Sequence, residues 1–115
     1  MIKITMLPQK NRIRKKKEIE KIFKKGRTFK EASLILKTMR NDLGVNRFGF
    51  IVSQKVAKKA NIRNKIKRRL REIIRLNSLK SDSDNLFITL PGMEKNDFAE
   101  TKRIAEKLLN KANIK

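Results

Sequence analysis

Residues 57–76 read AKKANIRNKIKRRLREIIRL and carry the strongest pattern in the sequence. The stretch holds five of the chain's eleven arginines and four lysines, against a single acid, Glu72. Placed on a helix at about 100° per residue, its aliphatic residues fall on one stripe. The stripe consists of Ile62, Ile66, Leu70, Ile73 and Ile74. The opposite face carries Asn64, Lys67, Arg68, Arg71 and Arg75, while Arg63 and Arg69 flank the stripe. We therefore predict an amphipathic helix that packs on a core and exposes a basic face.

The basic face places like charges on neighbouring helical turns. Arg68 and Arg71 are i,i+3 neighbours and Arg71 and Arg75 are i,i+4 neighbours, and each such pair weakens a helix by about 0.2–0.5 kcal/mol. An ordinary solvated face would interleave acids among the bases, whereas this one lacks them and is rich in arginine. Arginine donates two hydrogen bonds at once to a phosphate through its planar guanidinium. The pattern favours binding of a nucleic acid over a face that is merely solvated.

The composition points to the same kind of ligand. The 115 residues carry 32 basic and 11 acidic side chains, which gives a formal net charge of +21. Such a surplus is typical of nucleic-acid-binding domains, and the length fits a single RNA-binding domain, 1–115. Abundant lysine, isoleucine and asparagine also indicate an AT-rich genome, which raises the lysine count but does not explain the arginine cluster.

Several functions are disfavoured by what the sequence lacks. Without cysteine or histidine there is no disulfide, no thiolate metal site and no imidazole catalysis. There is also no Gly-rich phosphate loop, so we predict no catalytic residue and no metal ligand in this chain. No apolar run is long enough for a membrane span or a signal sequence, and we expect a cytoplasmic protein. Binding of the basic helix to anionic lipid is a weaker alternative, because the core needs its apolar stripe.

The remaining chain alternates helices and strands after an expected loose tail at residues 1–9. The pattern predicts helices at 14–25 and 97–112, an edge strand at 27–31, strands at 33–40, 47–53 and 86–90, and a polar loop at 78–85. Gly26 is expected to end the first helix as a C′ glycine, and Asp97 with Glu100 fits a capping box. This order predicts an α+β fold, a two-layer sandwich of a sheet and helices.

Several side chains outside the basic helix also bear on function. Asp82 and Asp84 are predicted to be solvated turn residues rather than ligands of a cation. Phe23 lies on the docking face of a lysine-rich helix, so it either joins the core or lines a groove where bases stack. Gly49 leaves one strand face open, either for a close approach or for a bulge. The other phenylalanines fall in apolar patterns and are expected in the core: Phe29, Phe48, Phe50, Phe87 and Phe98.

Three stretches, in this order, resemble the protein component of bacterial ribonuclease P. They are residues 11–13 (NRI) with 22–26 (IFKKG), residues 47–55 (RFGFIVSQK), and residues 57–71, where Arg63-Asn64-Lys65 is similar to the family's signature Arg-Asn-Arg motif. Weaker likeness continues at 86–88 and 100–102, so the resemblance covers nearly the whole chain.

The resemblance implies both a fold and a function. The fold is a four-stranded sheet with three main helices and a left-handed βαβ crossover, where general chain geometry favours the right-handed form. The function is that of the protein subunit of an endoribonuclease, ribonuclease P, which removes the 5′ leader of precursor tRNA to make the mature 5′ end. In this family the RNA subunit is catalytic and mainly holds the Mg2+ ions, and the protein alone is inactive. The implied partners are the RNA subunit and precursor tRNA, with no membrane.

The resemblance also assigns two binding surfaces. The RNA subunit is expected to contact Arg63, Asn64, Lys65, Lys67, Arg68, Arg71, Arg75, Asn11 and Arg12. The single-stranded leader is expected in a cleft between the first helix and the sheet, lined by Ile19, Phe23, Lys37, Arg47 and Lys55.

The sequence departs from the family pattern at three places. Lys65 stands at the third signature position, where a point charge replaces a bidentate arginine; we expect this change to be tolerated. Family aromatics of the cleft appear here as Ile19 and Lys37, which leaves Phe23 as the remaining ring and shifts leader binding toward charge. Leu90-Pro91 replaces the basic residues usual after the last strand.

Two other classes of basic protein remain as alternatives. A ribosomal-type protein or RNA chaperone without a catalytic role shares the size and charge, but does not need the three stretches in this order. A DNA-binding helix-turn-helix protein needs a partner helix just before its recognition helix, whereas a strand is predicted there.

Overall fold

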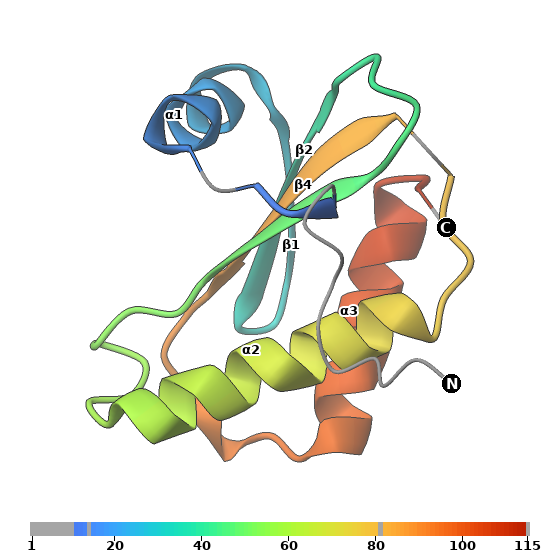
Figure 1. The fold of residues 1–115 in the computed structure, drawn as a ribbon. Coiled ribbons are helices and arrows are strands. Elements are labelled where there is room, and N and C mark those ends of the chain that lie inside the picture. The colour runs from blue at the N-terminus through green and yellow to red at the C-terminus, as the bar shows by residue number, and fades with distance from the viewer. Residues whose placement is uncertain (1–10, 14, 81, 115) are drawn as a thin grey trace, which may run out of the picture.

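The computed structural model describes residues 11–13, 15–80 and 82–114 and arranges helices around one sheet (Figure 1). In chain order the elements are α1 (Lys16–Lys25), β1 (Arg27–Glu31), β2 (Leu34–Arg40), β3 (Arg47–Ile51), α2 (Ala60–Arg75), β4 (Ser83–Thr89), a short 3-10 helix η2 (Met93–Lys95) and α3 (Phe98–Lys111). The predicted α+β class is confirmed, and the predicted helices and strands are present with shifted ends. The tail predicted at 1–9 lies outside the described residues.

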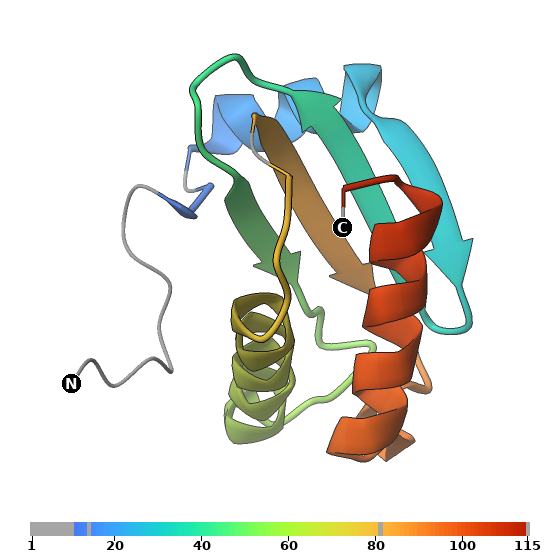
Figure 2. The ribbon, with the colours of Figure 1, turned by 90° about the vertical axis from the view of Figure 1, so that its right-hand side faces the viewer.

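The strands form a mixed sheet in the order β1-β2-β4-β3. β2 runs antiparallel to both β1 and β4, whereas β3 and β4 are parallel and are connected through α2. In Figure 2 both parallel strands run downward with α2 in front of the sheet, and β4 lies to the right of β3. This arrangement makes the crossover left-handed, as the family resemblance implied.

Helices cover both faces of the sheet (Figure 1). α2 and α3 pack on one face over the main core, which includes Leu34, Leu36, Phe48, Leu70, Phe87, Ile104 and Leu108. α1 packs on the other face over a smaller core of Ile13, Ile22 and Leu86. The predicted sandwich of sheet and helices is therefore present, with α1 as a further layer on the second face.

Gly49 allows the N-terminal segment to approach β3. A Cβ added there would lie 2.9 Å from Leu86 Cδ1 and 3.5 Å from Ile13 Cβ. Ile13 N donates to Phe48 O at 2.9 Å, and Arg12 forms a parallel bridge with Phe48. Because β3 pairs with β4 without interruption, a close approach rather than a bulge explains this glycine.

Gly26 ends α1 as predicted, but not through the left-handed conformation of a C′ glycine. Its φ is −73°, which any residue adopts. A Cβ added at Gly26 would lie 2.6 Å from Ile22 O and 3.2 Å from Thr38 O. The glycine therefore lets the chain turn closely from α1 into β1.

The prediction of a polar loop at 78–85 is wrong at its end, because β4 begins at Ser83. Asp84 and Asn85 are buried, with 3% and 0% of their surface exposed. Asn85 Oδ1 accepts a hydrogen bond from Thr38 Oγ1 at 2.8 Å, and Asp84 Oδ1 accepts one from Asn41 Nδ2 at 2.8 Å. The interpretation of Asp84 as a solvated turn residue is therefore also wrong. Polar residues with partners occupy these strand positions, and apolar periodicity does not detect them.

Candidate nucleic-acid interface

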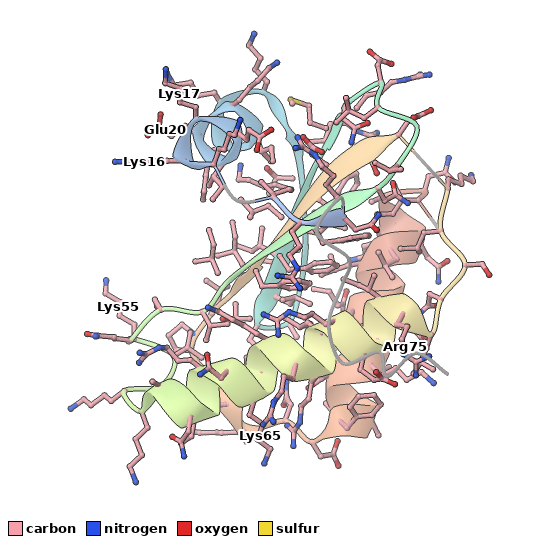
Figure 3. All side chains as sticks on the ribbon, viewed as in Figure 1. Lys16, Lys17, Glu20, Lys55, Lys65 and Arg75 are labelled. Atoms are coloured by element: carbon pink, nitrogen blue, oxygen red, sulfur yellow. The ribbon has the colours of Figure 1, made fainter. Side chains whose placement is uncertain are left out.

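The solvent-facing side of α2 carries a basic ridge, which we define as Asn64, Lys65, Lys67, Arg68, Arg71 and Arg75. α2 packs on the core through Ile66, Leu70, Ile73 and Ile74. Figure 3 shows Lys65 pointing away from the sheet and Arg75 near the C-terminal end of α2. Ile62, predicted in the apolar stripe, is 37% exposed, because the first turn of α2 extends beyond the sheet.

Two arginines predicted to contact RNA also bind protein groups. Arg63 Nη1 donates to Ala57 O at 2.9 Å and to Lys58 O at 2.7 Å, which fastens the loop that enters α2. Arg75 forms an ion pair with Glu72 one turn earlier. The hydrogen bonds between them raise the pKa of Arg75 and lower the pKa of Glu72. Both arginines therefore have a structural role in α2.

Between the ridge and β3 lies a hollow of about 170 Å³, here called the first hollow. It is lined by Arg12, Ile13, Phe48, Gly49, Phe50, Lys67 and Arg71. The guanidinium carbon of Arg71 lies 5.7 Å from the centroid of the Phe50 ring. Burial, followed by repulsion from Arg12 and Arg68, lowers the pKa of Arg71. The hollow thus gathers positive charge over an apolar floor, and a bound anion would relieve the repulsion.

The N-terminal segment is fastened beside the first hollow. Asn11 Nδ2 donates to Asn46 O at 2.6 Å, and the bridge between Arg12 and Phe48 aligns the segment with β3. Arg12 thereby lines the same hollow as Lys67 and Arg71, although it lies far from both in the sequence. The predicted RNA-binding residues of the N-terminal segment and of α2 therefore share one surface, and their contact with RNA stays a prediction.

On the α3 side of the ridge lies a second hollow of about 330 Å³. It is lined by Lys65, Arg68, Arg69, Glu72 and Phe98. Phe98 packs only partly against the main core, so the prediction of a core position holds for one part of its ring. The spacing of the four α2 residues places them on one helix face. Nothing in the sequence indicated that Phe98 would meet them, because that contact depends on the packing of α2 against α3.

On the other face of the sheet, α1 and β2 bring Phe23 and Lys37 together. Phe23 is 45% exposed, so the structure favours a groove position over a core position for its ring. Lys37 Nζ lies 5.5 Å from the centroid of this ring and donates to Thr28 Oγ1 at 2.9 Å. Ile19 packs at the border of the smaller core. An exposed ring beside an ammonium group can stack a base while the cation attracts its phosphate.

The two other residues predicted for this cleft are placed differently. The guanidinium of Arg47 binds Asp84 on β4 and Glu18 on α1, with N–O distances of 2.7 Å to each, and its side chain is 16% exposed. Lys55 lies on the loop after β3, at the opposite end of that strand from Arg47, and Figure 3 shows it away from α1. The guanidinium of Arg47 is therefore paired with carboxylates of the protein itself, and Lys55 lies apart from Phe23. Whether either residue meets the leader stays a prediction.

Metal-binding and membrane-spanning features are absent from the part of the chain that the structure describes. Residues 11–13, 15–80 and 82–114 contain no group of three or more acidic side chains placed to hold a metal ion. Within the same ranges, every helix is too short or too polar to cross a bilayer.

The mixed sheet, the left-handed crossover and the basic ridge between two hollows define a small α+β protein with a surface for a polyanion. The family model for ribonuclease P matches residues 7–113 of this chain. The chain therefore belongs to the ribonuclease P protein family, whose members are components of a tRNA-processing ribonucleoprotein endoribonuclease.

Individual relatives match over nearly the whole chain. The ribonuclease P protein component of Dehalococcoides mccartyi is 38% identical over 108 residues, covering 94% of this chain and 89% of its own. That of Clostridium botulinum is 34% identical over 109 residues, covering 92% and 97%. Solved RNase P proteins from Staphylococcus aureus and Thermotoga maritima have TM-scores of 0.85 and 0.80, each at 27% identity. They cover 90% and 87% of this chain, and this chain covers 96% of each of them. The fold of this chain is therefore that of the bacterial RNase P proteins.

Proposed function

We propose that this chain is the protein subunit of a cytoplasmic ribonuclease P. In this proposal the basic ridge and the first hollow bind the RNA subunit, and Phe23 with Lys37 binds the 5′ leader of precursor tRNA. The RNA subunit performs the cleavage that removes the leader, and the protein alone is inactive. Membership of the family supports the assignment. The proposal assigns a separate surface to each RNA, because the first hollow and the pair of Phe23 and Lys37 are built by different elements.

The observation that carries the assignment of the RNA-subunit surface is the convergence of cations from separate segments. Arg12 comes from the N-terminal segment, whereas Lys67 and Arg71 come from α2, and all three line the first hollow. Burial, followed by repulsion from Arg12 and Arg68, lowers the pKa of Arg71, so the protein around Arg71 disfavours its charge. Phosphates of a folded RNA would neutralise this cluster and release counterions.

The leader surface is supported by its difference from the first hollow. A single-stranded leader exposes its bases, and such strands bind where aromatic rings stack bases and cations follow the backbone. Phe23 and Lys37 supply one ring and one cation on the α1 side of the sheet, away from α2. We therefore assign leader binding to this face, with Ile19 as an apolar border.

We also propose that Mg2+ is held mainly by the RNA subunit rather than by this chain. The donor set supports this division, because the described residues bring together no three carboxylates that could hold an ion. When bound by the RNA, Mg2+ would activate water and stabilise the charge that develops at the scissile phosphate. The part of the protein is to bind and position the two RNAs.

Reconstitution tests the proposed function. The RNA subunit, precursor tRNA and Mg2+ are combined at near-physiological salt, with and without the protein, and release of the 5′ leader is followed on a gel. We expect the protein to increase accurate cleavage and to be inactive without the RNA subunit. A ribosomal-type protein or general RNA chaperone would act equally well on unrelated RNAs. A protein that gives no increase, or the same increase for an unrelated ribozyme, would contradict the assignment.

A further inference from the structure

The second hollow has a feature that phosphate binding alone does not require, namely an aromatic ring on its floor. Phe98 is the first residue of α3 and follows the N-cap residue Asp97, whose Oδ1 accepts from Glu100 N at 2.8 Å. This cap fixes the backbone that carries Phe98. One part of the ring packs against the main core, and the remainder faces the hollow.

The wall of the hollow is built by one face of α2. Lys65, Arg68, Arg69 and Glu72 follow each other at i, i+3, i+4 and i+7, so their side chains lie side by side. Arg69 Nη1 donates to Asn96 O at 2.8 Å, which ties this wall to the segment that precedes Phe98. Lys65 and Arg68 are exposed and have no such tie, so their cationic groups are available at the rim.

The acid in the hollow does not repel an anionic ligand strongly. Glu72 is paired with Arg75, and its carboxylate accepts two hydrogen bonds from that guanidinium. The charge of Glu72 is therefore compensated within α2. The rim as a whole remains positive.

We propose that the second hollow binds one unpaired nucleobase of the RNA that the ridge binds, with the base stacked on Phe98 and its phosphates at Lys65 and Arg68. This inference rests on the proposed function and adds to it a base-binding site on the α3 side of α2. The volume of about 330 Å³ is at the lower end of the range for ligand pockets, as a single nucleoside requires. The first hollow is less suited to stacking, because its Phe50 ring is half-buried and already stacks on the ring of Phe87, with the two ring centroids 6.0 Å apart.

The chain contains no tryptophan and no tyrosine, so a single tryptophan can report on this site alone. Phe98→Trp is titrated with the RNA subunit, and its fluorescence is recorded. Stacking of a base on the indole should quench the emission as the complex forms. Phe23→Trp is the matched control in the proposed leader cleft. It should respond to a single-stranded leader oligonucleotide, and much less to the RNA subunit alone.

Affinity gives the second measurement. Phe98→Leu keeps an apolar side chain but removes the ring, and it should weaken binding of the RNA subunit about 5- to 150-fold. Phe98→Tyr keeps the ring and should bind within about twofold of the unchanged protein. Phe29→Leu alters another partly buried phenylalanine, on β1, and should leave the affinity unchanged. Because no charge is removed, the salt dependence of binding should be the same for Phe98→Leu as for the unchanged protein.

The outcomes separate this inference from the proposed function. If the unchanged protein binds the RNA subunit and Phe98→Leu binds equally well, the base-binding site is wrong and the proposed function stands. The same conclusion follows if Phe98→Trp is not quenched in a complex that filter binding shows to be formed. If Phe98→Leu and Phe29→Leu weaken binding equally, along with their melting temperatures, Phe98 serves only the core. If the unchanged protein does not bind the RNA subunit, both proposals fail.

Discussion

Arg47 holds the carboxylate of Asp84 with two parallel hydrogen bonds, from Nε to Oδ1 at 2.8 Å and from Nη2 to Oδ2 at 2.7 Å. The two residues are direct neighbours across β3 and β4. Arg47 Nη1 also reaches Glu18 Oε2 at 2.7 Å, so one guanidinium connects α1 to both parallel strands. The hydrogen bonds with Asp84 raise the pKa of Arg47 above its ordinary value, and the residue stays charged. This connection fixes α1, and with it Phe23, against the sheet.

Removal of Arg47 should therefore destabilise the fold. Asp84 is 4% exposed at its side chain, and a charge left without its partner there costs about 3–5 kcal/mol. We expect Arg47→Met to lower the free energy of unfolding by about this amount in urea denaturation. Arg40→Met is the matched control, because Arg40 and Asp42 are 80% and 82% exposed and such pairs contribute about 0–1 kcal/mol.

A double variant tests whether the loss comes from the pair itself. Arg47→Met with Asp84→Leu removes both charges, so its cost should be smaller than the sum of the two single costs by about 1–3 kcal/mol. Strictly additive costs would mean that the two side chains act independently.

The positions of the arginines, and not the total charge, should determine binding of the RNA subunit. We expect Arg68→Ala and Arg71→Ala to weaken binding and to reduce the slope of log K against log salt by about one unit each. Arg103→Ala removes the same charge from the exposed surface of α3, outside the ridge, and should leave the slope unchanged. Filter binding at several salt concentrations provides the measurement. If Arg103→Ala and Arg68→Ala change the affinity and the salt slope equally, the ridge contributes only nonspecific charge to binding.

The Phe23 surface should act on substrate. Phe23→Ala and Lys37→Ala should lower the preference of the holoenzyme for precursor over mature tRNA, since one stacked base contributes about 1–3 kcal/mol. Because Phe23 is 45% exposed, Phe23→Ala should keep most of the stability. Ile22→Ala, at a position with 0% exposure, should cost about 2–5 kcal/mol instead. If the Phe23→Ala protein melts normally and its holoenzyme still prefers precursor over mature tRNA as strongly as the unchanged enzyme, Phe23 is not part of the leader site.

Anions should stabilise the isolated protein. A net charge of +21 opposes compaction, and at Arg71 burial together with repulsion from Arg12 and Arg68 lowers the pKa of the guanidinium. A ligand that binds only the folded form at a hundredfold excess over its Kd adds about 2.7 kcal/mol. We expect millimolar nucleoside diphosphate to raise the Tm and the helicity at low ionic strength, beyond the effect of chloride at equal ionic strength. If neither the helicity nor the Tm measured by circular dichroism changes when diphosphate is added, the charge of the basic surface does not destabilise the fold.

Periodicity and charge in the sequence were enough to predict the α2 face, because one helix contains both the apolar stripe and the basic ridge. The start of β4 was not predictable in this way. Asp84 and Asn85 are polar, and their burial depends on Arg47, Asn41 and Thr38, which are distant in the sequence. The local sequence pattern predicts a loop for such residues, because the hydrogen bonds that place them in a strand come from residues distant in the sequence.

In the candidate sites, too, the features within one helix were predictable from the sequence, whereas those that depend on tertiary packing were not. Arg68 and Lys65 share a helix, so their common face follows from spacing alone. The position of Arg12 in the same hollow as Lys67 depends on the approach of the N-terminal segment to Gly49. The left-handed crossover likewise came only from family resemblance, since general geometry predicts the opposite hand. Phe98 at the second hollow was missed because neither spacing nor resemblance indicated it.

The most direct test of the two-surface account is a titration of protein against a fixed amount of RNA subunit, with the rate of precursor tRNA cleavage as the readout. A variant with Arg68→Ala and Arg71→Ala should need more protein but reach the unchanged rate at saturation, because only assembly is weakened. A variant with Phe23→Ala and Lys37→Ala should saturate at the unchanged protein concentration, yet with a lower kcat/KM for precursor. Two results would contradict the assignment of the two RNAs to separate surfaces. One is a cleavage rate of the Phe23 and Lys37 variant that excess protein restores, and the other is a cleavage rate of the arginine variant that stays low at saturation.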